Sequence, residues 1–201
     1  MELRDALSQI AEIRQQMARG QTFRGYRSAT TAFSGFLAIV TALFQHLLVP
    51  DPALAPRSFV LLWAAAAMIC LIVVGAEMFI RTRRSPAGGV QRELTLMAVE
   101  QFMPSVVVGA VLAGILCAYY PHLVWLLPGL WMILFSLGVF ASCRLLPHGA
   151  FAVAGFYLIA GILALIVSPG HREAALMGAA FSLGQLALAA ILYFRLERPR
   201  D

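Results

Sequence analysis

The feature that most constrains this chain is a pair of apolar runs within residues 99–146, separated only by the corner Tyr119-Tyr120-Pro121-His122. Each run is long enough to cross a bilayer, which takes about 20 apolar residues. Because the connection is so short, the second run has to turn straight back beside the first. The pattern predicts a transmembrane helical hairpin, and the flanking sequence predicts two further hairpins around it.

The rest of the chain repeats this alternation of apolar runs and short polar corners. Charged residues make up 12% of the sequence, against about 25% in soluble domains, and they gather at the two ends and in a loop at 81–93. The runs are continuous rather than alternating, which favours helices over a β-barrel. We predict an all-α fold, a polytopic bundle of six transmembrane helices at about 29–49, 58–80, 98–119, 123–143, 149–167 and 174–194.

The pattern of residues 2–18 predicts a further helix outside the membrane. Its apolar positions recur at spacings of three and four and form one stripe, which consists of Leu3, Ala6, Ile10, Ile13 and Met17. Such a helix lies on the membrane surface or docks on the bundle; alternatively, it forms a short two-stranded coiled coil that makes a dimer. We expect residues 1–27 to be a cytoplasmic amphipathic helix with its linker, and residues 28–201 to be the membrane domain.

The arginines predict the orientation of the chain. The net charge of +5 involves no lysine, and thirteen of the fifteen arginines fall on one side of the predicted spans, with only Arg57 and Arg172 on the other. The positive-inside rule then places both termini in the cytoplasm. Because the arginines cap membrane segments, we expect no nucleic-acid partner. The first apolar run is longer than the core of a signal peptide, so we expect it to be retained as a span.

Small residues indicate where helices approach closely. On the third span, Gly109, Ala110, Ala113 and Gly114 form two overlapping pairs at a spacing of four; on the sixth, Gly178, Ser182, Gln185 and Ala189 share one face. We expect these faces to point into the bundle. Each outward span ends near a proline and each returning span at an arginine, which indicates either a threefold repeat of hairpins or the ordinary pattern of a six-span protein. Cys70, Cys117 and Cys143 fall at different depths, and we expect them to be packing residues rather than disulfide partners.

The segment LLPGLWMILFSLGVFASCRLLPHG (126–149), together with GQTFRGYRSAT (20–30), resembles a group of small bacterial multi-spanning membrane proteins that are known mainly as uncharacterised. The resemblance covers most of the chain, and its motifs are packing and loop residues. It implies a location in the bacterial inner (plasma) membrane and a helical membrane fold. It transfers no active-site residue.

Three histidines suggest a site at the outer face. His46 ends the first span, His122 follows Pro121, and His171 follows Pro169-Gly170, so each hairpin contributes one imidazole to the same side. Converging imidazoles could bind zinc or copper, or could titrate near pH 6 and sense acidity. Alternatively, these are three unrelated histidines at the membrane interface.

Four polar residues suggest a second site in the inner half: Glu77, Glu100, Gln101 and Gln185. Ionisable residues within a span are functional candidates by default, and Glu77 and Glu100 could form a cytoplasm-facing proton or cation site. Alternatively, Glu77 pairs with Arg81 four residues on and anchors its span at the interface.

The sequence contains no catalytic or nucleotide-binding motif of the HExxH, GxSxG, Walker or glycine-rich dinucleotide type, so we do not expect an enzyme. Two functions remain. The first is a non-enzymatic interaction or regulatory module, or a subunit of a complex, in which residues 2–18 contact a protein partner or a second copy and the spans contact lipid. The alternative is a small transporter or channel for a solute, an ion or protons, which would use Glu77 and Glu100.

Overall fold

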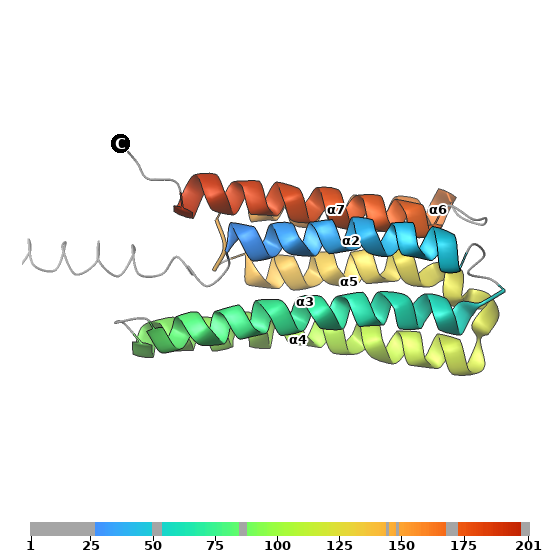
Figure 1. Ribbon diagram of the computed structural model, residues 1–201, viewed down its shortest axis with the longest axis horizontal. Helices are drawn as coiled ribbons and strands as arrows, with labels where there is room; N and C mark the ends of the chain where they lie inside the picture. Colours follow the sequence, from blue (N-terminus) through green and yellow to red (C-terminus); the bar gives the residue numbers. More distant parts are fainter. Residues whose placement is uncertain are drawn as a thin grey trace, which may run out of the picture.

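A computed structural model of the chain describes residues 27–49, 54–84, 88–143, 145–147, 149–167 and 173–197. Every regular element in these ranges is helical (Figure 1). The helices are α2 (Ser28–Leu48), α3 (Pro56–Arg84), α4 (Gly88–Tyr119), α5 (Leu127–Ser142), α6 (Ala150–Val167) and α7 (Glu173–Leu192), with a 3-10 turn η1 (Pro121–Leu126) before α5 and a π-helical turn η2 (Tyr193–Glu197) after α7.

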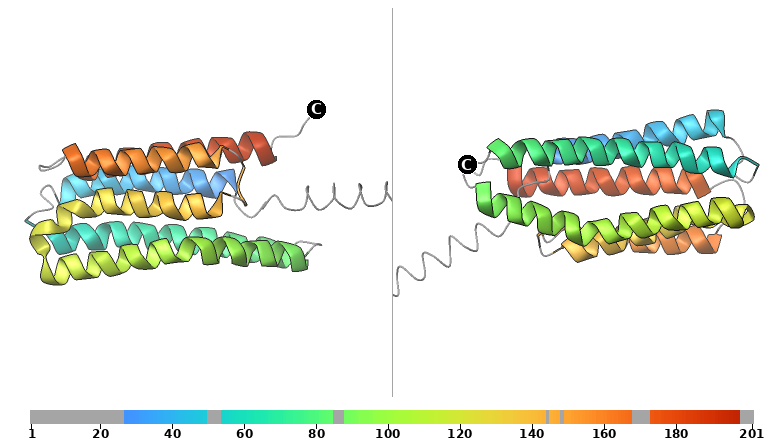
Figure 2. Two further views of the ribbon diagram at one scale, coloured as in Figure 1. Left: turned by 180° about the vertical axis from the view of Figure 1, so that it is seen from behind. Right: turned by 90° about the horizontal axis from the view of Figure 1, so that it is seen from below.

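The prediction of a six-helix membrane bundle is confirmed. Six helices among the described residues are long and apolar enough to cross a membrane: Ser28–Leu48, Pro56–Ile80, Leu96–Tyr119, Pro121–Ser142, Ala150–Val167 and Ala175–Arg195. They run side by side along the long axis of the molecule (Figures 1 and 2). The chain is therefore a multi-pass membrane protein. The predicted amphipathic helix at 2–18 lies outside the described residues.

The most extensive packing joins two helices from opposite ends of the sequence. The first and last spans, α2 and α7, form the most extensive contact, followed by α5 with α6 and α4 with α5. The partners within the other two predicted hairpins, α2 with α3 and α6 with α7, also touch, but less extensively. Whether the three hairpins are a true repeat stays a prediction, while the packing centres on α2, α5, α6 and α7.

Glycine brings α2 and α7 together. A Cβ atom added at Gly35 would lie 3.2 Å from the carbonyl oxygen of Ser182, and one added at Gly178 would collide with the Cβ of Ala42. Gly35 thus lies beside Ser182, and the later residue Ala42 lies beside the earlier residue Gly178, so the two helices are antiparallel. Gly178 and Ser182 are buried and Gln185 is half-buried, so the predicted inward face of the sixth span is confirmed.

Glycines also allow α5 and α6 to approach each other closely. An added Cβ at Gly161 would lie 2.8 Å from the carbonyl oxygen of Gly129 and 3.0 Å from the backbone nitrogen of Ile133. Further along this interface, the hydroxyl of Ser136 donates a 2.8 Å hydrogen bond to the carbonyl oxygen of Ala154. Two helix backbones can approach this closely only where no side chain separates them.

The prediction for the third span is half wrong. Gly109 and Ala113 are buried, and the Trp131 indole of α5 donates a 3.1 Å hydrogen bond to the carbonyl oxygen of Gly109. Ala110 and Gly114 are exposed instead, and nothing lies within 4 Å of a Cβ added at Gly114. Successive residues of a helix are about 100° apart, so the two overlapping pairs cannot face the same neighbour, and only Gly109–Ala113 faces α5.

An aromatic cluster fills the centre of the bundle. Phe135 of α5 contacts the rings of Phe102, Tyr157 and Phe181, with centroid distances of 5.3, 4.8 and 5.3 Å. All three are edge-on contacts, the arrangement that aromatic rings favour. The cluster therefore joins α4, α5, α6 and α7 around one side chain.

The two glycines on α6 provide a matched test of this packing. We expect Gly161→Ala to lower the free energy of unfolding by about 1–3 kcal/mol, because the new methyl group meets backbone atoms of α5 that cannot move aside. Gly155→Ala should be neutral or should stabilise by up to about 1 kcal/mol, because nothing lies within 4 Å of its added Cβ and alanine is the better helix former. Unfolding of both variants in detergent would measure the difference, and equal effects would contradict the α5–α6 packing.

Candidate functional site

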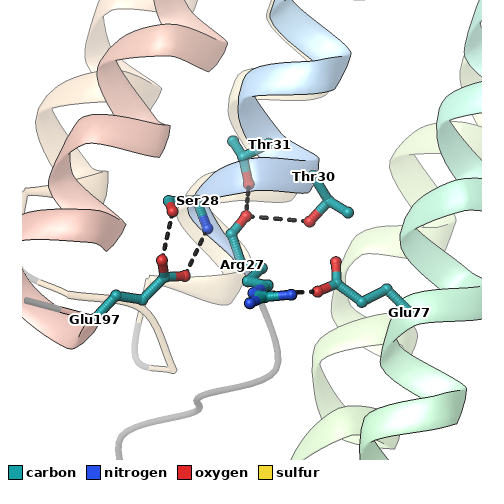
Figure 3. Close-up of polar contacts among 6 residues, drawn as sticks. All are labelled: Arg27, Ser28, Thr30, Thr31, Glu77 and Glu197. Carbon is teal, nitrogen blue, oxygen red and sulfur yellow. Dashed lines mark hydrogen bonds and ion pairs between the residues drawn. The ribbon is translucent and has the colours of Figure 1, made fainter.

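A polar cluster surrounds the start of α2 (Figure 3), at the end of the bundle where α3 ends and α4 begins. We call Arg27, Ser28, Glu77 and Glu197 the α2-start cluster. It draws its members from α2, α3 and the η2 turn after α7. It is the densest group of side-chain hydrogen bonds and ion pairs that we find in the described part of the chain.

Glu197 caps the first turn of α2. Its carboxylate accepts a 2.9 Å hydrogen bond from the backbone nitrogen of Ser28 and a 2.6 Å bond from the Ser28 hydroxyl. The first backbone N–H groups of a helix have no partner within the helix, and a carboxylate there also complements the helix dipole. The side chain of Arg27, at the N-cap position, makes no capping hydrogen bond. Glu197, from a distant part of the sequence, therefore provides the acceptor that an N-cap side chain normally provides.

Arg27 reaches the neighbouring helix on the other side. Its Nε lies 3.9 Å from Oε1 of Glu77, and the Glu77 side chain is only 17% exposed whereas that of Arg27 is 57% exposed. The sequence suggested Arg81 as the partner of Glu77; the ion pair in the structure is with Arg27, while the side chain of Arg81 lies outside the described residues. The start of α2 is thus bonded to α3 on one side and to the end of the α7 segment on the other (Figure 3).

A second polar contact joins α2 to α3 at the opposite end. The indole nitrogen of Trp63 donates a 2.7 Å hydrogen bond to the side-chain oxygen of Gln45, and both residues are 5% exposed. Trp63 lies near the start of α3, and its buried indole N–H group is satisfied by Gln45. Sequence reasoning missed Gln45, although a lone amide within an apolar span was a signal that could have found it.

Gln185, on the predicted inward face of the sixth span, lies beside Tyr157 of α6. The Gln185 side chain lies beside the Tyr157 hydroxyl, and this hydroxyl donates a 3.2 Å hydrogen bond to the carbonyl oxygen of Phe181. Gly184 makes room for the tyrosine ring, because an added Cβ there would collide with it. The amide therefore has a polar neighbour within the bundle core.

Glu100 and Gln101 have a different environment from the other two residues of the predicted inner site. Both are exposed on α4, and neither makes a hydrogen bond or ion pair with the residues that the structure describes. Gln185 lies against Gly35, which is eight residues, or about 12 Å, along α2 from Arg27. The contacts of the described residues thus pair Glu77 with Arg27 and place Gln185 beside Tyr157, and none of them joins two of the four predicted residues. A shared transport path stays a prediction.

The predicted outer-face metal site also stays a prediction. His46 is exposed at the end of α2, and His122 is exposed in η1, where its ring lies 6.4 Å from that of Tyr120. His171 lies outside the described residues. Within the described ranges, no three histidine, cysteine or acidic side chains come close enough to hold a metal ion. The three cysteines are free thiols.

Removing the Glu197 carboxylate should loosen the first turn of α2. We expect Glu197→Ala to cost about 1 kcal/mol locally, the usual effect of losing a helix cap, which corresponds to roughly fivefold faster amide hydrogen exchange at residues 28–31. Arg195→Ala is the control, because Arg195 is exposed and makes no bond to α2. Unchanged exchange in Glu197→Ala would contradict the cap.

The contact between Trp63 and Gln45 can be measured with a double-mutant cycle. Trp63→Phe leaves the amide oxygen of Gln45 without its donor, and Gln45→Leu leaves the indole N–H without its acceptor. We expect a coupling energy of about 1 kcal/mol, in the range of hydrogen bonds between membrane helices. Strictly additive effects on unfolding in detergent would show that the bond contributes nothing.

No protein-family model, no curated protein and no solved structure matches this chain. Its function therefore has to be argued from its own residues.

Proposed function

We propose that this protein is a non-enzymatic membrane subunit or regulatory module of the bacterial inner membrane. In this proposal both termini are cytoplasmic and the segment 2–18 binds a protein partner or a second copy. The supporting observation is that three polar side chains of the bundle each have a separate local partner. Glu77 pairs with Arg27, Gln45 with Trp63, and Gln185 with Tyr157. A transport path would instead need such groups to share one wet cavity.

The α2-start cluster gives the proposed contact a physical route into the membrane. Arg27 directly follows residues 1–26, and it is fastened to α3 through Glu77, while Ser28 is fastened to the α7 segment through Glu197. A partner that binds 2–18 and shifts Arg27 would therefore act on three helices at once. This arrangement suits a module that reports or transmits binding, because the coupling needs a structural element that both sites can bias.

The apolar stripe of 2–18 can be tested by photo-crosslinking in native membranes. A photoreactive amino acid in place of Ile10, on the stripe, should give a discrete protein adduct with the mass of a second copy or of one partner. The matched control places it at Glu12, on the polar face two residues on, where the protein adduct should be at least several-fold weaker. Adducts with lipid alone from both positions would contradict the proposed contact.

The transport alternative makes the opposite prediction for purified protein in vesicles. On the proposed function, proton or cation flux should not exceed that of protein-free vesicles. A flux that Glu77→Gln or Glu100→Gln abolishes would overturn the proposal in favour of a transporter.

A further inference from the structure

One carboxylate in a membrane span points out of the bundle. Glu100 belongs to the span Leu96–Tyr119 of 24 residues. With that span centred in a bilayer, its Cα lies about 11 Å from the midplane, inside the hydrocarbon half-thickness of about 15 Å. Ionisable residues at such depths almost always face protein or a watery cavity. Glu100 is exposed and has no hydrogen-bonding or ionic partner among the described residues.

The exposed side of α4 carries a row of small residues that begins ten residues, or about 15 Å, after Glu100. Ala110, Gly114 and Ala118 are exposed on it at spacings of four, and nothing lies within 4 Å of a Cβ added at Gly114. On the opposite side of α4, Ala98 and Ala113 are buried against the rest of the bundle. The open face therefore combines small residues that allow backbone approach with one carboxylate that has no partner among the described residues.

Charge complementarity identifies what would cover this face. A carboxylate in hydrocarbon is stabilised by a basic side chain at the same depth. The arginines whose side chains the structure describes, Arg27, Arg57, Arg83 and Arg195, all stand at helix ends, where they reach water. A second copy placed symmetrically against α4 would oppose Glu100 with another Glu100. Neither these described arginines nor a symmetric second copy offers a base at the depth of Glu100, and we take a different protein as its source.

We propose that the face of α4 formed by Glu100, Ala110, Gly114 and Ala118 docks a transmembrane helix of a partner protein, and that this helix carries an arginine or lysine about one turn inside its cytoplasmic end. The small residues allow the partner helix to approach, and Glu100 sets its register by pairing with the base. This inference rests on the proposed function as a subunit, and it names a contact inside the membrane that is separate from residues 2–18.

The test uses the full chain in phosphatidylcholine vesicles with a synthetic leucine–alanine transmembrane helix as the probe. One probe carries a single arginine one turn inside its end, and a control probe carries leucine there. Energy transfer between labelled chain and labelled probe should report association about tenfold tighter for the arginine probe, the size expected of a polar contact between membrane helices.

Variants of the chain locate the contact. Glu100→Leu should remove the advantage of the arginine probe, and Gly114→Leu should weaken association with both probes. Gly155→Leu on α6 is the matched control, because its added Cβ is equally unobstructed, and it should bind both probes as the unmodified chain does. Both test positions are exposed on α4, so these variants should fold.

Three results would overturn the inference. The two probes could associate equally, which would leave this face to lipid, with Glu100 satisfied by headgroups and water. The arginine probe could keep its advantage against Glu100→Leu, which would place the contact elsewhere. Two differently labelled copies of the chain could associate with each other and lose that association in Gly114→Leu, which would make a second copy the occupant. Residues 2–18 are unaltered throughout, so photo-crosslinking from Ile10 reports on the proposed function independently.

Discussion

Inside a bilayer, two helices gain nothing by hiding apolar surface from each other, because lipid tails are as apolar as leucine. Helix association then depends on close contact between backbones and on hydrogen bonds to buried polar groups. In this protein the close contacts occur at glycines. Gly35 and Gly178 lie between α2 and α7, Gly129 and Gly161 between α5 and α6, and Gly109 between α4 and α5. These are also the three helix pairs that pack most extensively.

Helix α3 lies outside this scheme and is held in another way. Its only glycine, Gly75, has nothing within 4 Å of an added Cβ, and its span is the least buried of the six in the described structure. Two polar contacts tie it to α2 instead, Trp63 to Gln45 near one end and Glu77 to Arg27 near the other. These contacts are 14 residues, or about 21 Å, apart on α3. A polar contact near each end thus holds α3 against α2, in place of close packing along the length of the helix.

The number and positions of the spans could be predicted from sequence because the bilayer alone sets the hydropathy and length that a span requires. The directions of side chains around each helix were harder to predict. Gly109-Ala110 and Ala113-Gly114 look equivalent in sequence, and only the place of α5 decides that Gly109 is covered and Gly114 is not. Which side chains pair across the bundle also depends on where the neighbouring helices lie. The pairing of Arg27 with Glu77 joins residues 50 positions apart, whereas the pattern of i and i+4 pairs pointed to a neighbour on the same helix.

The uneven packing separates two roles within one small bundle. Buried contacts concentrate on α2, α5, α6 and α7, where glycines and the ring of Phe135 fix the arrangement. The spans of α3 and α4 bury the smallest share of their length, and α4 carries on its uncovered side the carboxylate that lipid suits least. A protein that only had to sit in the membrane would gain from an apolar residue at that position. The cost of an uncovered carboxylate is offset once a second helix covers it, which is the physical reason to regard α4 as an interface rather than as a plain lipid-facing surface.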